Sequence, residues 1–90
     1  MSEQMTIHVR LFAGPAQQLG VSHLELHLLR KNASEQLCVG DVANRLCDQY
    51  PELASLIKRS RWAVGTDFVT QQQELTNRQT LALIPPVSGG

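Results

Sequence analysis

The sequence predicts an α+β fold in which one main helix packs across a mixed β-sheet. Two segments near the N-terminus alternate apolar and polar residues, as half-buried strands do. Residues 39–50 space their apolar side chains with helical periodicity, and residues 80–84 form the short apolar run of a central strand. Because 90 residues can enclose one hydrophobic core and not two, we expect a single folded domain.

The first alternating segment covers residues 6–13. Ile7, Val9 and Leu11 face one side of the predicted strand, and Phe12 faces the other, with no evident role in the core. Gly14-Pro15 is expected to break the strand, and a short loop or helical turn should follow over residues 16–20.

The second alternating segment covers residues 22–29 and should pair antiparallel with the first, because the connection between them is short. Its leucines share one face, and His23, Glu25 and His27 share the other, where His8 of the first strand could join them. Imidazole and carboxylate groups can bind a metal ion. An open antiparallel sheet ordinarily exposes such side chains, so we predict no metal site.

The predicted helix over residues 39–50 has one apolar stripe and ends where Pro51 follows Tyr50. Pro51 can also begin a second short helix. Cys38 lies just before the main helix, and we interpret it as a capping or buried residue, although a helix start can make a thiol reactive. The basic residues 58–61 are typical of a solvated helix end.

In the remaining sequence, residues 62–70 are expected to form irregular β-structure with a turn at Gly65-Thr66-Asp67. Residues 80–84 are expected to form a last strand that is buried on both faces. If the first and last strands pair in parallel at the centre of the sheet, the topology is a β-grasp. The predicted organisation is then a β-grasp domain, residues 1–84, and an extended tail, residues 85–90.

Composition excludes several classes of function. Eight basic and eight acidic side chains cancel, whereas nucleic-acid binders need a basic surface. No apolar stretch could span a membrane, and the N-terminal residues lack the apolar region of a secretion signal, so we expect a cytoplasmic protein with reduced cysteines. No set of side chains forms a nucleophile–base arrangement, and we expect no turnover from this chain alone.

The tail carries the chemistry that the sequence does suggest. It consists of Pro85, Pro86, Val87, Ser88, Gly89 and Gly90. The prolines favour a stiff extended segment, and six extended residues reach about 20 Å. A narrow channel that excludes a Cβ atom would admit Gly89 and Gly90. The sequence therefore indicates an arm that delivers a terminal carboxylate into the active site of another protein.

The tail resembles that of ubiquitin-like sulfur carriers, in particular the small subunits of molybdopterin synthases. The likeness rests mainly on residues 83–90, Leu-Ile-Pro-Pro-Val-Ser-Gly-Gly, and on the opening segment 9–13, Val-Arg-Leu-Phe-Ala. Departures from the family pattern lie at Ala16-Gln17, at Gly65, and at residues 77–79, Asn-Arg-Gln, where many members carry Gly-Asp.

This resemblance implies a mechanism centred on Gly90. An adenylating enzyme similar to those that activate ubiquitin would join AMP to the Gly90 carboxylate, and a sulfur donor would then convert it to a thiocarboxylate. The sulfur would pass to a pyranopterin precursor in a large synthase subunit, with which a heterotetramer is expected. ATP and magnesium would belong to the adenylating enzyme, and this chain would bind no cofactor itself.

The resemblance also implies partner contacts, for which the candidates are Phe12, Ile84 and the tail residues 85–88. Three other functions stay open on the sequence alone. They are a carrier for thiamine or cysteine synthesis, a ubiquitin-like modifier conjugated through Gly90, and a binding module with an inert tail.

Overall fold

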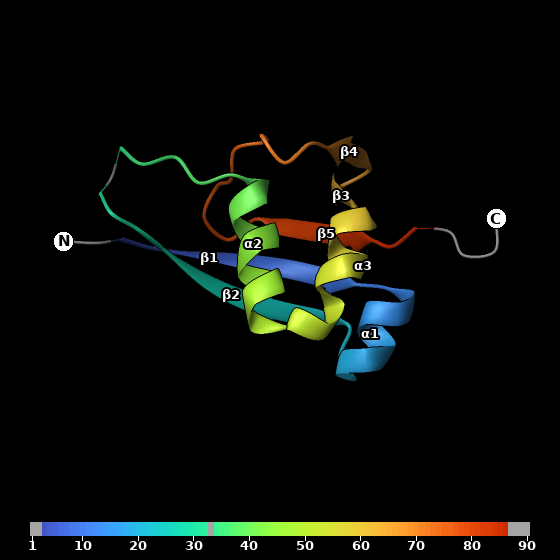
Figure 1. The fold of residues 1–90 in the computed structure, drawn as a ribbon. Helices are drawn as coiled ribbons and strands as arrows, with labels where there is room; N and C mark the ends of the chain where they lie inside the picture. Colours follow the sequence, from blue (N-terminus) through green and yellow to red (C-terminus); the bar gives the residue numbers. More distant parts are fainter. Residues whose placement is uncertain (1–2, 33, 87–90) are drawn as a thin grey trace.

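The computed structural model describes residues 3–32 and 34–86 (Figure 1). The chain begins with strand β1, helix α1, strand β2 and helix α2, which span Glu3–Leu11, Ala13–Leu19, His23–Arg30 and Val39–Gln49. It continues with a 3₁₀ turn η1, helix α3 and strands β3, β4 and β5, which span Pro51–Leu53, Ala54–Arg59, Arg61–Val64, Asp67–Val69 and Thr80–Ile84.

The strands form one mixed sheet in the order β2-β1-β5-β3-β4. The central pair, β1 and β5, is parallel, and the other neighbouring pairs are antiparallel. Helix α2 crosses the sheet in Figure 1, with α3 beside it. The first and last strands thus meet at the centre of the sheet, which confirms the predicted β-grasp.

The core lies between the helices and one face of the sheet. On that face Ile7, Val9 and Leu81 are fully buried, and Leu46 of α2 packs in the same cluster at 1% exposure. This is the alternation that the sequence predicts for the first strand, because successive side chains of a strand point to opposite faces.

The prediction that β5 is buried on both faces is wrong. Leu81 and Leu83 are buried, but Thr80 is exposed and Ala82 and Ile84 are only half-buried. Among the described residues the helices cover one face of the sheet, so β5 is central in the sheet without being enclosed on both sides.

The end of the first strand also differs from the prediction. Strand β1 ends at Leu11, and Gly14-Pro15 does not form a break but lies in the first turn of α1. Proline is tolerated there because the first N–H groups of a helix have no intrahelical partner. Phe12, predicted at the strand end, is the extended residue between β1 and α1.

Helix α2 begins and ends close to the predicted residues. Cys38 occupies the N-cap position, half-buried, and its backbone N–H donates to Oδ2 of Asp41 at 2.8 Å. The helix ends one residue early, at Gln49, and the proline that follows begins η1. In the described part of the chain, no helix is long and apolar enough to cross a membrane.

Candidate functional site at the carboxyl end of β5

The tail begins at the centre of the sheet. Strand β5 lies between β1 and β3, and its last residue, Ile84, leads directly into Pro85 and Pro86. Pro85 is half-buried and Pro86 is exposed. The other predicted tail residues, Val87, Ser88, Gly89 and Gly90, lie outside the described residues. The fold therefore fixes the base of the tail on a rigid strand.

An apolar patch lies beside the base of the tail, on the sheet face opposite the helices. Ile84 pairs with Arg61, and the register of β1 with β5, continued by one residue, brings Phe12 next to Ile84. Phe68 of β4 lies on the same face. We call Phe12, Phe68, Ala82 and Ile84 the β5-end patch.

Phe68 is the functional candidate that sequence reasoning missed. It is 56% exposed, more than Phe12 at 40%. Residues 62–70 are too irregular in hydrophobicity to assign faces before the hairpin register is known. In the structure Phe68 pairs with Ala63, which pairs in turn with Ala82 of β5. The available signal was an aromatic residue directly after the Gly-containing turn at residues 65–67.

Two arginines flank the aromatic side chains of the patch. The guanidinium carbon of Arg61 lies 4.3 Å from the ring centroid of Phe68, and that of Arg10 lies 5.8 Å from the ring of Phe12. Both distances fall within the range of cation–π attraction. The β5-end patch thus combines exposed apolar side chains with two cations, which suits a partner whose apolar surface also carries carboxylates.

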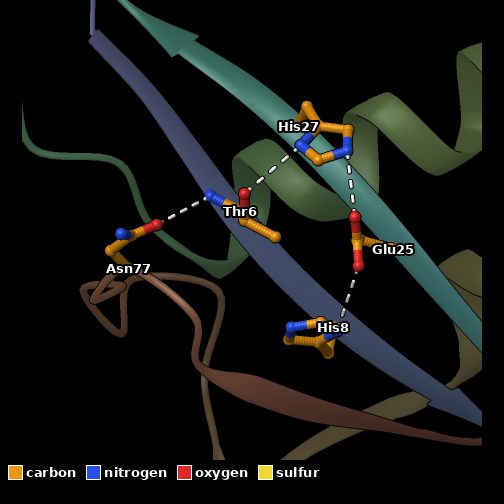
Figure 2. A network of polar contacts seen from close by, with 5 residues as sticks. All are labelled: Thr6, His8, Glu25, His27 and Asn77. Carbon is orange, nitrogen blue, oxygen red and sulfur yellow. Dashed lines mark hydrogen bonds and ion pairs between the residues drawn. The ribbon is translucent and has the colours of Figure 1, made fainter.

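The row of polar side chains on β1 and β2 forms a separate network (Figure 2). Glu25 lies between two imidazoles, with Oε2 at 3.2 Å from Nε2 of His27 and Oε1 at 3.9 Å from Nδ1 of His8. Thr6 Oγ1 lies 3.2 Å from Nδ1 of His27, and Asn77 Oδ1 accepts from the Thr6 N–H. Within residues 3–32 and 34–86 no group of three or more such side chains is arranged to hold a metal ion.

A shallow cleft of about 340 Å³ lies between β2 and α2. Its lining residues are Leu28, Leu29, Leu37, Asp41, Asn44, Arg45 and Asp48. Strand β1 separates β2 from β5, so this cleft is remote from the base of the tail. It is not part of the candidate site.

Comparison with known proteins identifies the family. Residues 9–90 match the ThiS family, a range that runs from β1 through the tail. The chain belongs to the ThiS family. As a ThiS-family protein with a β-grasp fold, it is a ubiquitin-like sulfur carrier. No match was found among curated protein sequences.

Solved structures with the same fold include three archaeal proteins. SAMP1 of Haloferax volcanii superposes with a TM-score of 0.74 at 22% identity, over 94% of this chain and 99% of that chain. A putative molybdopterin converting factor subunit 1 of Pyrococcus furiosus gives 0.74 at 21% identity, over 92% and 99%. The ubiquitin of Caldiarchaeum subterraneum gives 0.61 at 22% identity, over 98% and 100%. At these identities the likeness shows the fold of this ThiS-family protein.

Proposed function

We propose that this ThiS-family protein is the sulfur-carrying small subunit of a molybdopterin synthase and that the Gly90 carboxylate is its reactive group. The observation that carries the proposal is the exit of the central strand β5 directly into Pro85-Pro86 beside an exposed apolar patch. The sequence of residues 85–90, Pro-Pro-Val-Ser-Gly-Gly, supports it, as does the molybdopterin converting factor among the proteins of the same fold.

The chemistry begins with activation, because a carboxylate has no good leaving group. A Gly90 oxygen attacks the α-phosphorus of ATP on an adenylating enzyme, and pyrophosphate leaves. Sulfide supplied by a sulfur donor then attacks the carbonyl carbon of the acyl-adenylate, AMP leaves, and a thiocarboxylate remains. The sulfur passes to a pyranopterin precursor in the large synthase subunit, and two transfers build a dithiolene.

This chain's own contribution is delivery and docking. Phe12, Ile84 and Phe68 would anchor the partner, while Pro85, Pro86, Val87 and Ser88 would direct Gly89 and Gly90 into its active site. Exposed aromatic side chains are typical anchors of protein interfaces, since they bury a large area with few rotatable bonds. ATP and magnesium would be held by the adenylating enzyme and not by this chain.

The test is the intact mass of the protein purified from cells that supply an adenylating enzyme and a sulfur source. We expect a mass gain equal to the replacement of one oxygen by sulfur, and its loss when Gly90 is deleted. An unmodified mass, with adenylation of Gly90 demonstrated in the same extract, would refute the sulfur-carrier function. Complementation of strains deficient in molybdopterin, thiamine or cysteine synthesis then separates the possible pathways.

A second candidate function is protein modification, favoured by the likeness to the small archaeal modifier protein SAMP1. In that case Gly90 would form an isopeptide bond with lysine side chains of target proteins. Mass spectrometry of tryptic digests would then find lysines bearing the C-terminal residues of this chain, in place of a free thiocarboxylate.

A further inference from the structure

Strand β2 is a long, unprotected edge of the sheet. It spans His23–Arg30 and pairs only with β1 among the strands of the described chain. Figure 1 shows it as the outermost strand on its side. The opposite edge, β4, is only three residues long. Proteins commonly protect edge strands by shortness, charged side chains, proline or bulges. Strand β2 is long, has no lysine or proline and keeps an unbroken register with β1, and its charged residues are Glu25 and Arg30.

The direction of the free backbone groups on β2 follows from its pairing with β1. The Leu11 N–H donates to the Ser22 carbonyl at 2.9 Å, which makes these two opposed residues a hydrogen-bonded pair. Because such pairs alternate along an antiparallel ladder, Leu24, Leu26 and Leu28 bond to β1. The N–H and C=O groups of the odd-numbered residues from His23 to Leu29 therefore point away from the sheet.

The side chains along this edge are complementary to a second copy of themselves. In an antiparallel pair centred on Leu26, Glu25 lies opposite the partner's His27, and His27 lies opposite the partner's Glu25. A register centred on Glu25 would instead oppose two carboxylates, and one centred on His27 would oppose two imidazoles. The leucines of both copies lie on the same face only in registers that oppose even-numbered residues to even-numbered ones. Few registers meet this condition, and side-chain charge selects among them.

The same register continues the apolar face. Leu26 meets the partner's Leu26, and Leu28 meets the partner's Leu24. Leu28 also lines the cleft beside α2, together with Leu37 and polar residues of α2 such as Asp41. Each outward residue pair, such as Glu25 with the partner's His27, can exchange two backbone hydrogen bonds.

From these observations we infer that β2 is a self-association site: two copies of this chain pair β2 to β2, antiparallel about a two-fold axis at Leu26, into one continuous sheet. This inference goes beyond the proposed function and does not depend on it. Strand β1 separates β2 from β5, so the dimer leaves the β5-end patch and the base of both tails accessible. Such a dimer could present two carriers at once.

The test combines sedimentation velocity with amide NMR on the full chain, from roughly micromolar to millimolar concentration at fixed pH and salt. We expect a monomer–dimer equilibrium. The amide signals of His23, Glu25, His27 and Leu29 should shift with concentration more than those of Leu24, Leu26 and Leu28, which bond to β1.

Charge variants then test the register. His27→Glu opposes carboxylates across both symmetry-related pairs and should weaken the dimer about tenfold. The swap of Glu25→His with His27→Glu restores an acid–imidazole pair at each position and should recover the wild-type dissociation constant to within about threefold. Leu29→Pro removes an outward N–H but no bond to β1, and it should also weaken the dimer.

Three outcomes would overturn the inference. One is a wild-type chain that stays monomeric up to millimolar concentration. Another is a dimer whose concentration-dependent shifts lie at Phe12, Phe68 and Ile84, which would place the contact on the β5-end patch. The third is a swap variant as weak as His27→Glu alone while its circular dichroism and unfolding midpoint match those of the wild type.

Discussion

At the scale of single residues, Arg78 is held in a backbone conformation that favours glycine. Its φ angle is +67°, and its N–H donates to the Thr6 carbonyl at 2.6 Å. The preceding residue, Asn77, accepts from the Thr6 N–H at 2.9 Å (Figure 2). These two hydrogen bonds therefore connect the turn that precedes β5 to strand β1. A Cβ atom in this region of backbone space costs about 1–2 kcal/mol.

We predict that Arg78→Gly stabilises the domain by about 0.5–1 kcal/mol, because it removes the strain and keeps the N–H that bonds to Thr6. The measurement is the free energy of unfolding in urea. Arg78→Ala is the matched control, since alanine keeps the Cβ atom and should give no such gain. A glycine variant no more stable than the alanine variant would show that the turn carries no strain.

Phe68 supports a second prediction at this scale. Phe68→Ala should weaken binding to the adenylating enzyme or synthase subunit by about 2 kcal/mol, roughly thirtyfold, since an exposed aromatic anchor is lost. Stability should change little. The control is Val21→Ala, an exposed apolar residue outside the β5-end patch. Equal affinities for the two variants, measured by calorimetry, would remove Phe68 from the interface.

At the scale of elements, α2 packs on the sheet through one narrow stripe of apolar side chains. Val39, Val42 and Leu46 are buried, whereas Asn44, Arg45 and Asp48 are exposed. Its N-terminus is stabilised by Asp41, which accepts from the Cys38 N–H. Because residues outside the stripe contribute little packing, the stability of the element is concentrated in few side chains.

We predict that Leu46→Ala destabilises the protein by about 2–5 kcal/mol, because it leaves a cavity under the middle of α2. Arg45→Ala, one residue away on the exposed face, should change the free energy of unfolding by less than about 0.5 kcal/mol. Thermal unfolding followed by circular dichroism compares the two variants. Similar losses would mean that the stripe does not define the core.

At the scale of the whole molecule, truncation can test the predicted division into a β-grasp domain, residues 1–84, and a tail, residues 85–90. The buried apolar residues of the described chain lie between Met5 and Leu83. We predict that removing residues 87–90 changes the free energy of unfolding by less than about 0.5 kcal/mol but abolishes the sulfur-dependent mass gain. A loss above about 1 kcal/mol would contradict the predicted division between domain and tail.

The sequence predicted most of the fold because its signals are periodic. Alternation in the first two strands, the stripe of α2 and the apolar run of β5 each have a local physical cause. The burial of β5 on both faces was wrong, because local composition does not reveal whether a second layer covers a strand. The same holds for Phe68, whose position depends on the pairing of β3 with both β4 and β5.

The candidate site was also predicted only in part from the sequence. Phe12 and Ile84 were predicted from their sequence context, and the structure brings them together through the parallel register of β1 with β5. Such a register joins residues more than seventy positions apart, such as His8 and Thr80, and local patterns cannot encode it.

The central position of β5 also determines when the protein can fold during its synthesis. Among the strands of the described chain, β5 is made last, and it connects the β1–β2 pair to the β3–β4 pair. Before β5 emerges from the ribosome, the nascent chain holds two separate strand pairs, β1 with β2 and β3 with β4, and helices α1, α2 and α3 without the complete sheet to pack on. A chain truncated before residue 80 therefore presents exposed apolar surface to cellular proteases. The cell would thus make either a folded protein, in which β5 positions the tail, or a fragment that is degraded.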